Sequence, residues 1–132
     1  MRTKARETAF QVLFASSFNE GIDNGLKNAL CKNEKLEGKD IEYVDCVLNT
    51  VGAHRGEFEE VIDKLSLSFP SVRIYPADKS ILLIALAEIK YMDDIPPAVS
   101  ANEAANIASK YSSEKSASYI TGILSEAIKQ NV

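Results

Sequence analysis

The 132-residue sequence predicts an all-α protein of about seven helices. Apolar residues recur mostly with the helical period, and no stretch alternates apolar and polar residues for long enough to indicate a strand. The run from Ile81 to Ala87 is apolar around the whole helical circumference, which is typical of a helix buried among others. The length suits a single domain with its own core. Cys31 and Cys46 indicate reduced thiols rather than a disulfide framework or a zinc site.

The first half of the chain predicts four helices. A turn signal at 19–21 ends the first, and Asp40 is placed as the N-cap of the third. Gly52 and Gly56 flank His54 and indicate a break, so we expect His54 in a surface loop between the third and fourth helices. The predicted ranges are about 4–18, 23–33, 40–51 and 57–65.

The second half predicts three helices. Pro76 can begin the central apolar helix without losing a hydrogen bond, and the prolines at 96 and 97 stop it. Ser100 and Glu103 have the spacing of a capping box, which predicts that the next helix begins at Ser100. Ser113 is placed to cap the final helix, at about 114–129. Gly122 lies within it at a cost of about 1 kcal/mol relative to alanine, which indicates close packing or backbone access there.

Positive charge is concentrated at the start of the chain. Arg2, Lys4 and Arg6 lie in the first six residues with no acidic residue among them, whereas the whole chain has a net charge of −4. Arg2 and Arg6 share a helical stripe with Leu13, and an unpaired arginine is costly to bury, so we expect the first turn to protrude from the bundle. A protruding cationic helix start is suited to bind nucleic-acid phosphates. A frayed, solvated terminus is the alternative.

Two sets of aromatic residues have predicted positions beyond the main apolar stripes. Tyr119 lies nearly opposite the inward stripe of the last helix, on the same side as Lys115, and an aromatic ring beside a cation can stack an RNA base. The alternative is a tyrosine that lies along a neighbouring helix. Phe14 and Phe18 widen the apolar arc of the first helix, which either accepts a partner or is covered by other helices of the chain.

No catalytic or metal-binding pattern is present in the sequence. His54 is the only histidine, and we find no glycine-rich phosphate loop and no metal motif, so we expect no enzymatic activity, no metal and no cofactor. The N-terminus has no apolar signal-peptide region, and the longest apolar run is too short to span a bilayer. The expected location is cytoplasmic, with no membrane partner.

Three ordered stretches resemble the NusB family of bacterial transcription antitermination factors. Residues 2–14 are similar to the arginine-rich first helix of that family, residues 76–89 to its central helix, and residues 95–124 to its C-terminal signature. The resemblance implies an all-helical fold of two small subdomains, about 1–67 and 68–132, and a non-catalytic role.

The resemblance also implies partners. NusB-family proteins bind the boxA element of nascent RNA together with NusE, a small-subunit ribosomal protein, and load the complex onto elongating RNA polymerase, which favours processive transcription of ribosomal RNA operons. Two sets of residues match the family by position. The RNA-binding set is Arg2, Lys4, Arg6 and Tyr119, with Lys115 beside Tyr119, and the NusE-facing set is Phe14 and Asp78, with Phe18 next to Phe14.

The cationic arm is sparser than in many relatives. Three phosphate contacts on single-stranded RNA give a salt slope of only about −2, so tight binding is expected to need NusE. The double substitution Arg2→Ala with Arg6→Ala is expected to weaken RNA binding and leave folding intact. A homodimeric structural or regulatory module of the same fold is the alternative function. A NusB-like domain of an RNA methyltransferase is not expected, because we find no methyl-donor-binding domain in the sequence.

Overall fold

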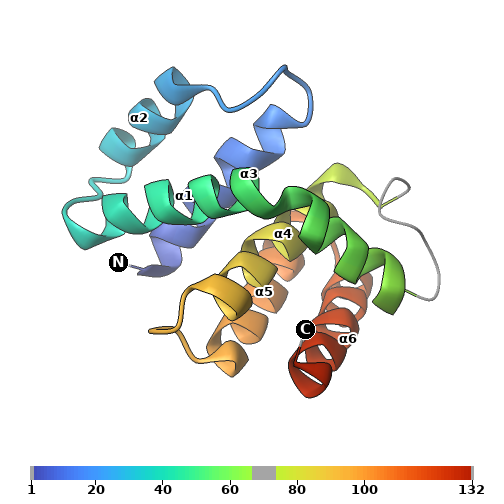
Figure 1. The fold of residues 1–132 in the computed structure, drawn as a ribbon. Helices are drawn as coiled ribbons and strands as arrows, with labels where there is room; N and C mark the ends of the chain where they lie inside the picture. Colours follow the sequence, from blue (N-terminus) through green and yellow to red (C-terminus); the bar gives the residue numbers. More distant parts are fainter. Residues whose placement is uncertain (1, 67–73, 132) are drawn as a thin grey trace.

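The computed structural model describes residues 2–66 and 74–131, which form six α-helices and no strand (Figure 1). The all-α prediction is therefore confirmed for these residues. The helices are α1 (Arg2–Ser16), α2 (Asn24–Asn33), α3 (Lys39–Leu65), α4 (Pro76–Tyr91), α5 (Pro97–Tyr111) and α6 (Glu114–Gln130).

Helix α3 accounts for the difference between the seven helices predicted and the six observed. The predicted helices 40–51 and 57–65 are joined into one, and only His54 leaves helical geometry inside it, with φ −124° and ψ 19°. The flanking glycines thus mark a kink rather than a loop. His54 does not lie in a loop as predicted, because α3 continues through it, and its ring stacks on Tyr91 of α4 with centroids 4.1 Å apart.

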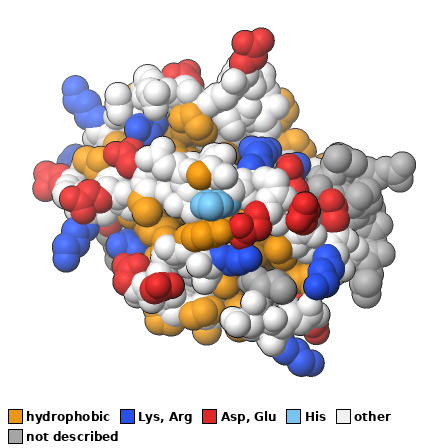
Figure 2. All heavy atoms as spheres, in the orientation of Figure 1, with side chains coloured by type: hydrophobic (Ala, Val, Ile, Leu, Met, Phe, Trp, Pro, Cys, Tyr) orange, Lys and Arg blue, Asp and Glu red, His pale blue; other side chains and the backbone are white. Residues whose placement is uncertain are grey.

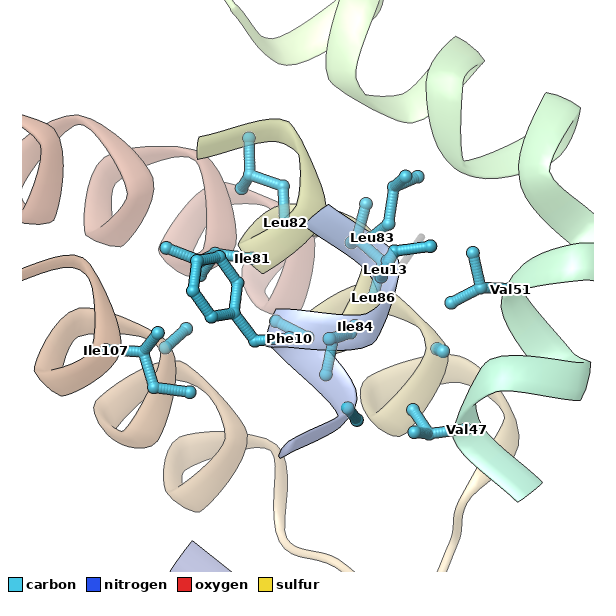
Figure 3. Packing of buried hydrophobic residues seen from close by; sticks show 14 of the residues in the cluster. Phe10, Leu13, Val47, Val51, Ile81, Leu82, Leu83, Ile84, Leu86 and Ile107 are labelled. Carbon is cyan, nitrogen blue, oxygen red and sulfur yellow. The ribbon is translucent and has the colours of Figure 1, made fainter. Parts of the chain in front are cut away.

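Helix α4 is the central element, as its apolar circumference predicts. Every residue from Ile81 to Glu88 is buried, and α1, α3, α5 and α6 all pack against this helix. Side chains of α1, α3 and α5 converge with those of α4 in the core (Figure 3). The labelled members of that cluster are Phe10, Leu13, Val47, Val51, Ile81, Leu82, Leu83, Ile84, Leu86 and Ile107.

The start of α5 differs from the prediction. The helix begins at Pro97, one turn before Ser100, so the predicted capping box is wrong. Proline suits the first turn because its missing N–H has no helical acceptor there. Ser100 and Glu103 face the interior instead, where Ser100 donates to Glu88 and Glu103 accepts from Arg6.

Helix α6 confirms one local prediction and corrects another. Ser113 is its N-cap, and the Ser113 hydroxyl accepts a hydrogen bond of 3.0 Å from the backbone N–H of Ser116. A Cβ atom on Gly122 would have no atom of residues 2–66 and 74–131 within 4 Å beyond its own helix and chain neighbours, so the close packing predicted there is wrong for this part of the chain.

The predicted subdomain boundary, between residues 67 and 68, lies outside the described residues. Within the described parts, α1 packs against α2, α3 and α4, and α5 packs against α6, with α4 in contact with both groups. The division into two subdomains stays a prediction. None of the described helices combines the length and the hydropathy needed to cross a membrane.

Candidate nucleic-acid interface

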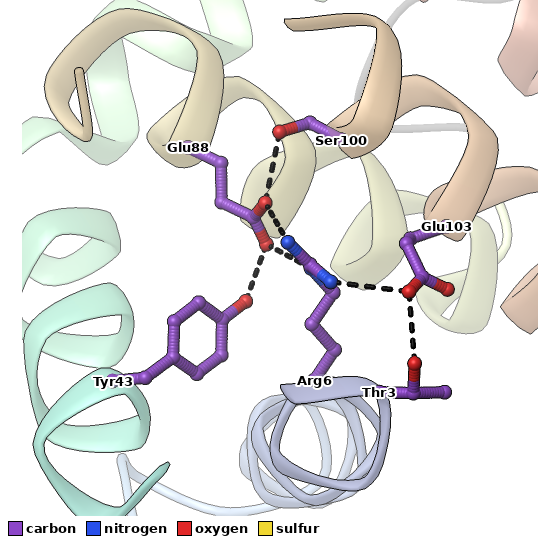
Figure 4. Close-up of polar contacts among 6 residues, drawn as sticks. All are labelled: Thr3, Arg6, Tyr43, Glu88, Ser100 and Glu103. Atoms are coloured by element: carbon purple, nitrogen blue, oxygen red, sulfur yellow. Dashed lines mark hydrogen bonds and ion pairs between the residues drawn. The ribbon is translucent and has the colours of Figure 1, made fainter. Parts of the chain in front are cut away.

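Arg6 lies in a buried polar network that joins α1, α3, α4 and α5 (Figure 4). Its Nε and Nη2 atoms donate to the two carboxylate oxygens of Glu88, at 2.8 and 2.9 Å, and Nη1 donates to Glu103 at 3.2 Å. Arg6 is only 4% exposed. The expectation that Arg6 protrudes is therefore wrong, because α4 and α5 supply the carboxylates that its burial requires.

Glu88 is the centre of this network. Besides Arg6, its carboxylate accepts hydrogen bonds from the hydroxyls of Tyr43 and Ser100. Burial lowers the pKa of Arg6, but the hydrogen bond and charge of Glu88 outweigh that effect and leave the pKa above its ordinary value. Burial raises the pKa of Tyr43 far above its ordinary value, and the charge of Glu88 raises it further. Arg6 is thus held charged and Tyr43 neutral.

Neither Glu88 nor Tyr43 was among the predicted site residues, although the sequence contains a signal for one of them. Glu88 is a carboxylate that directly follows the apolar run Ile81–Ala87 in the central helix. A charge at such a position must be paired when it is buried. The cations at the start of the chain are candidates to pair with Glu88, and only the tertiary fold shows that Arg6 does so.

Arg2 and Lys4 remain accessible at the start of α1. Arg2 is partly exposed, its guanidinium carbon lies 4.6 Å from the centre of the Tyr43 ring, and it has no ion pair within the described residues. The Lys4 side chain is 47% exposed, and its Nζ lies 3.9 Å from Glu7 Oε2, at the outer limit of an ion pair. The first turn therefore presents two cations rather than three.

Lys115 and Tyr119 lie at the start of α6, away from the first turn of α1. Lys115 is exposed, whereas Tyr119 is partly buried against the core and its hydroxyl is 2.8 Å from the Ser66 hydroxyl. Tyr119 is thus not the outward ring predicted, since it packs partly against the core and its hydroxyl meets the residue that caps α3. The structure places the predicted RNA residues in two groups rather than in one cluster.

Helices α1 and α5 are linked at the surface between these two groups. Glu7 on α1 pairs with Lys110, at 3.1 Å, and accepts a hydrogen bond from the Tyr111 hydroxyl. The hydrogen bond and charge of Glu7 raise the pKa of Lys110. On the face drawn in Figure 2, basic and acidic side chains are interspersed in this way rather than gathered by sign.

Phe14 and Phe18, predicted for a protein interface, belong to a row of aromatic rings. Phe14 stacks on Phe10 with centroids 5.8 Å apart, and Phe18 meets Phe14 edge-on at 5.3 Å. Phe18 follows the end of α1, at Ser16, and is 68% exposed. Other helices therefore cover Phe10 and part of Phe14 but leave Phe18 at the surface.

Asp78, the third predicted interface residue, does not lie at the surface. It is 5% exposed in the first turn of α4, and its Oδ2 accepts a hydrogen bond of 2.9 Å from the Ser116 hydroxyl. Its Oδ1 is buried with no hydrogen-bond partner among residues 2–66 and 74–131. The NusE-facing position that the resemblance implies for Asp78 is therefore buried in this structure, because its place in the first turn of α4 faces α6 rather than solvent.

The comparisons with known proteins identify the family. The model of the NusB family matches residues 3–129. The chain belongs to the NusB family. A relative named transcription antitermination protein NusB, from Methylacidiphilum infernorum (isolate V4), is 38% identical over an alignment of 133 residues that covers 98% of this chain and 92% of the relative. The protein of that name from Natranaerobius thermophilus is 34% identical over 132 residues, with 98% and 95% coverage.

Solved structures confirm the NusB-like fold. T. maritima NusB superposes with a TM-score of 0.89 at 24% identity, covering 98% of this chain and 92% of that one. A complex of the antitermination factors NusB and NusE with double-stranded RNA contains a chain with a TM-score of 0.85 at 24% identity, covering 98% of this chain and 96% of that one.

Proposed function

We propose that this NusB-family protein is a transcription antitermination factor that binds boxA-type single-stranded RNA together with a NusE-type ribosomal protein. The observation that carries the proposal is its nearly full-length similarity to relatives named transcription antitermination protein NusB. The complex of NusB and NusE with double-stranded RNA, among the solved structures of this fold, supports RNA and a NusE-type protein as partners. In this role the protein promotes processive transcription of ribosomal RNA operons.

The proposed RNA path begins at the first turn of α1. Arg2 and Lys4 bind phosphates there, and the strand then follows α5 toward Lys115 and the partly buried Tyr119 at the start of α6. Thr3 contacts Glu103, and α5 ends at Tyr111, so the part of this path along α5 is about 12 Å long at 1.5 Å per residue. A short single-stranded segment can span that length, which reconciles one RNA site with two groups of residues.

The small number of accessible cations makes the partner important. Contacts at Arg2 and Lys4 alone give a salt slope of about −1.4 on single-stranded RNA, and a third contact at Lys115 raises it only to about −2. A net charge of −4 adds no general attraction to RNA. The NusE-type protein would occupy the Phe14 and Phe18 side and add its own RNA contacts.

The proposed action is that of an adaptor without catalysis. The protein would carry RNA and its NusE-type partner to elongating RNA polymerase in the cytoplasm, where transcription takes place. None of its described residues forms a group of three or more side chains suited to a metal ion. No step of this mechanism requires a cofactor, because binding alone accomplishes it.

A titration with two RNAs tests the proposal. Fluorescently labelled boxA-type RNA and a scrambled RNA of equal length are titrated with this protein, with and without the NusE-type protein of the same organism. We expect tight, sequence-dependent binding only when both proteins and boxA-type RNA are present. Equal affinity for the two RNAs, or full affinity without the second protein, would contradict the proposal.

A homodimer that uses the same apolar surface is the alternative function, and exposed Phe18 is the observation that favours it. Sedimentation at micromolar concentration distinguishes the two. We expect the protein alone to sediment as a monomer and to form a larger complex with the NusE-type protein. A stable dimer that the NusE-type protein and RNA fail to dissociate would favour the alternative.

A further inference from the structure

Tyr43 connects the buried network to the accessible Arg2. It is 2% exposed, and its hydroxyl donates to Glu88. Two arginines of α1 also contact the Tyr43 ring. Their guanidinium carbons lie 4.6 Å (Arg2) and 5.7 Å (Arg6) from the ring centre. A tyrosine ring attracts cations through its negative face. Tyr43 therefore contacts both the paired arginine and the unpaired one.

Glu88 cannot neutralise Arg2. A carboxylate has about four acceptor positions, and Glu88 already accepts two bonds from Arg6, one from Ser100 and one from Tyr43. The Nε of Arg2 is buried without a hydrogen-bond partner among the described residues. Arg2 is thus held by a ring rather than by an acid, and its charge stays available for an anion.

We propose that Tyr43 is a positioning residue for RNA binding, which holds the Arg2 guanidinium in place to receive a phosphate. This inference rests on the proposed function. A flexible arginine loses side-chain freedom when it binds, and a preordered one loses less. Burial holds the Tyr43 ring in place, the ring holds Arg2, and the first turn of α1 presents an ordered cation.

A double-mutant cycle tests the proposal with the NusE-type protein present and labelled boxA-type RNA as the probe. Tyr43→Leu should weaken RNA binding about threefold to tenfold, whereas Tyr43→Phe, which keeps the ring, should bind nearly as the wild type does. In an Arg2→Ala background Tyr43→Leu should have no further effect. Tyr91→Leu is the matched control, since it removes a tyrosine that has no arginine of the described residues on its ring, and should leave affinity unchanged.

Two measurements cover the case in which Tyr43→Leu fails to fold. Arg2→Lys keeps the charge but not the planar group, so RNA affinity should fall toward that of Arg2→Ala while thermal unfolding stays unchanged. In the free protein, heteronuclear NMR should show the Arg2 Nε–H proton shifted by the ring current of Tyr43. An unshifted proton would overturn the inference.

The outcomes separate this inference from the proposed function. If the wild type binds boxA-type RNA no better than scrambled RNA, both fail. If the wild type prefers boxA-type RNA and either Tyr43→Leu or Arg2→Lys binds this RNA as tightly as the wild type does, only the inference fails. An equal loss from Tyr43→Leu with and without Arg2 would show a merely structural role and would also overturn it.

Discussion

At the residue scale, Glu88 stabilises the buried Arg6 near the start of α1. Its carboxylate is 1% exposed and compensates the charge of Arg6. We predict that Glu88→Gln lowers the free energy of unfolding by about 3–5 kcal/mol, because it leaves the Arg6 charge buried without its main partner. Urea unfolding followed by circular dichroism measures this loss.

Glu103→Gln is the matched control for that substitution. Glu103 also pairs with Arg6, but its side chain is 19% exposed and water can compensate the lost contact. Its effect should stay near 1 kcal/mol. If the two substitutions destabilise the protein equally and weakly, the network does not hold α1 in the way described.

Arg6 shows why the sequence-based test of the cationic arm has to change. The substitution Arg6→Ala would leave Glu88 as a buried, partly uncompensated charge, so Arg2→Ala with Arg6→Ala would damage folding as well as RNA binding. The expectation that this double variant folds normally does not fit the structure. Arg2 and Lys4 are the pair that can be removed without opening the core.

Tyr43 makes a prediction about alkaline pH. Burial and Glu88 raise its pKa above the ordinary value of 10.0, so its contribution is fully present below pH 10 and is lost as the pH rises beyond that, where only the unfolded chain ionises. The stability advantage of the wild type over Tyr43→Phe should shrink by about 1.4 kcal/mol per pH unit in that range. Urea unfolding at about pH 9 and about pH 11 measures it. A difference that is the same at both pH values would show that Tyr43 is not kept neutral.

At the element scale, the helices differ in how far local sequence predicts them. The burial of α4 on all sides and the N-cap of α6 at Ser113 can be predicted from neighbouring residues, and both predictions are confirmed. The start of α5 cannot, because Ser100 and Glu103 bind partners on α4 and α1 that only the fold brings near. Local signals therefore fail where a polar side chain has a long-range partner.

Helix α6 contains a glycine that the protein fold does not require. Gly122 has ordinary helical geometry, is exposed, and has no atom of the described helices and loops within 4 Å of where a Cβ would lie, its own helix and chain neighbours aside. Gly122→Ala should raise the free energy of unfolding by about 0.5–1 kcal/mol, through helix propensity. Thermal unfolding tests this. A destabilised variant would mean that something packs closely against this position.

At the scale of the whole molecule, the sequence predicts the helical fold and its central helix but only part of the site. Arg2 and Lys4 are accessible as expected, whereas Arg6 and Asp78 are buried because each finds a polar partner on another helix. Charge and position along one helix identify a cationic stripe. They cannot show which of its members the fold neutralises, since Glu88 lies 82 residues away from Arg6.

The central claim is that Arg2 and Lys4, in the first turn of α1, bind RNA phosphates. Titration of boxA-type RNA, with the NusE-type protein present, compares Arg2→Ala/Lys4→Ala with the control Lys32→Ala/Lys129→Ala, which removes equal charge from exposed positions at the ends of α2 and α6. We predict that the first variant folds normally, loses about 10- to 30-fold in affinity at about 0.1 M salt, and has a salt slope reduced by about 1.4. The control should match the wild type. Titration curves that are identical for all three proteins would contradict the account.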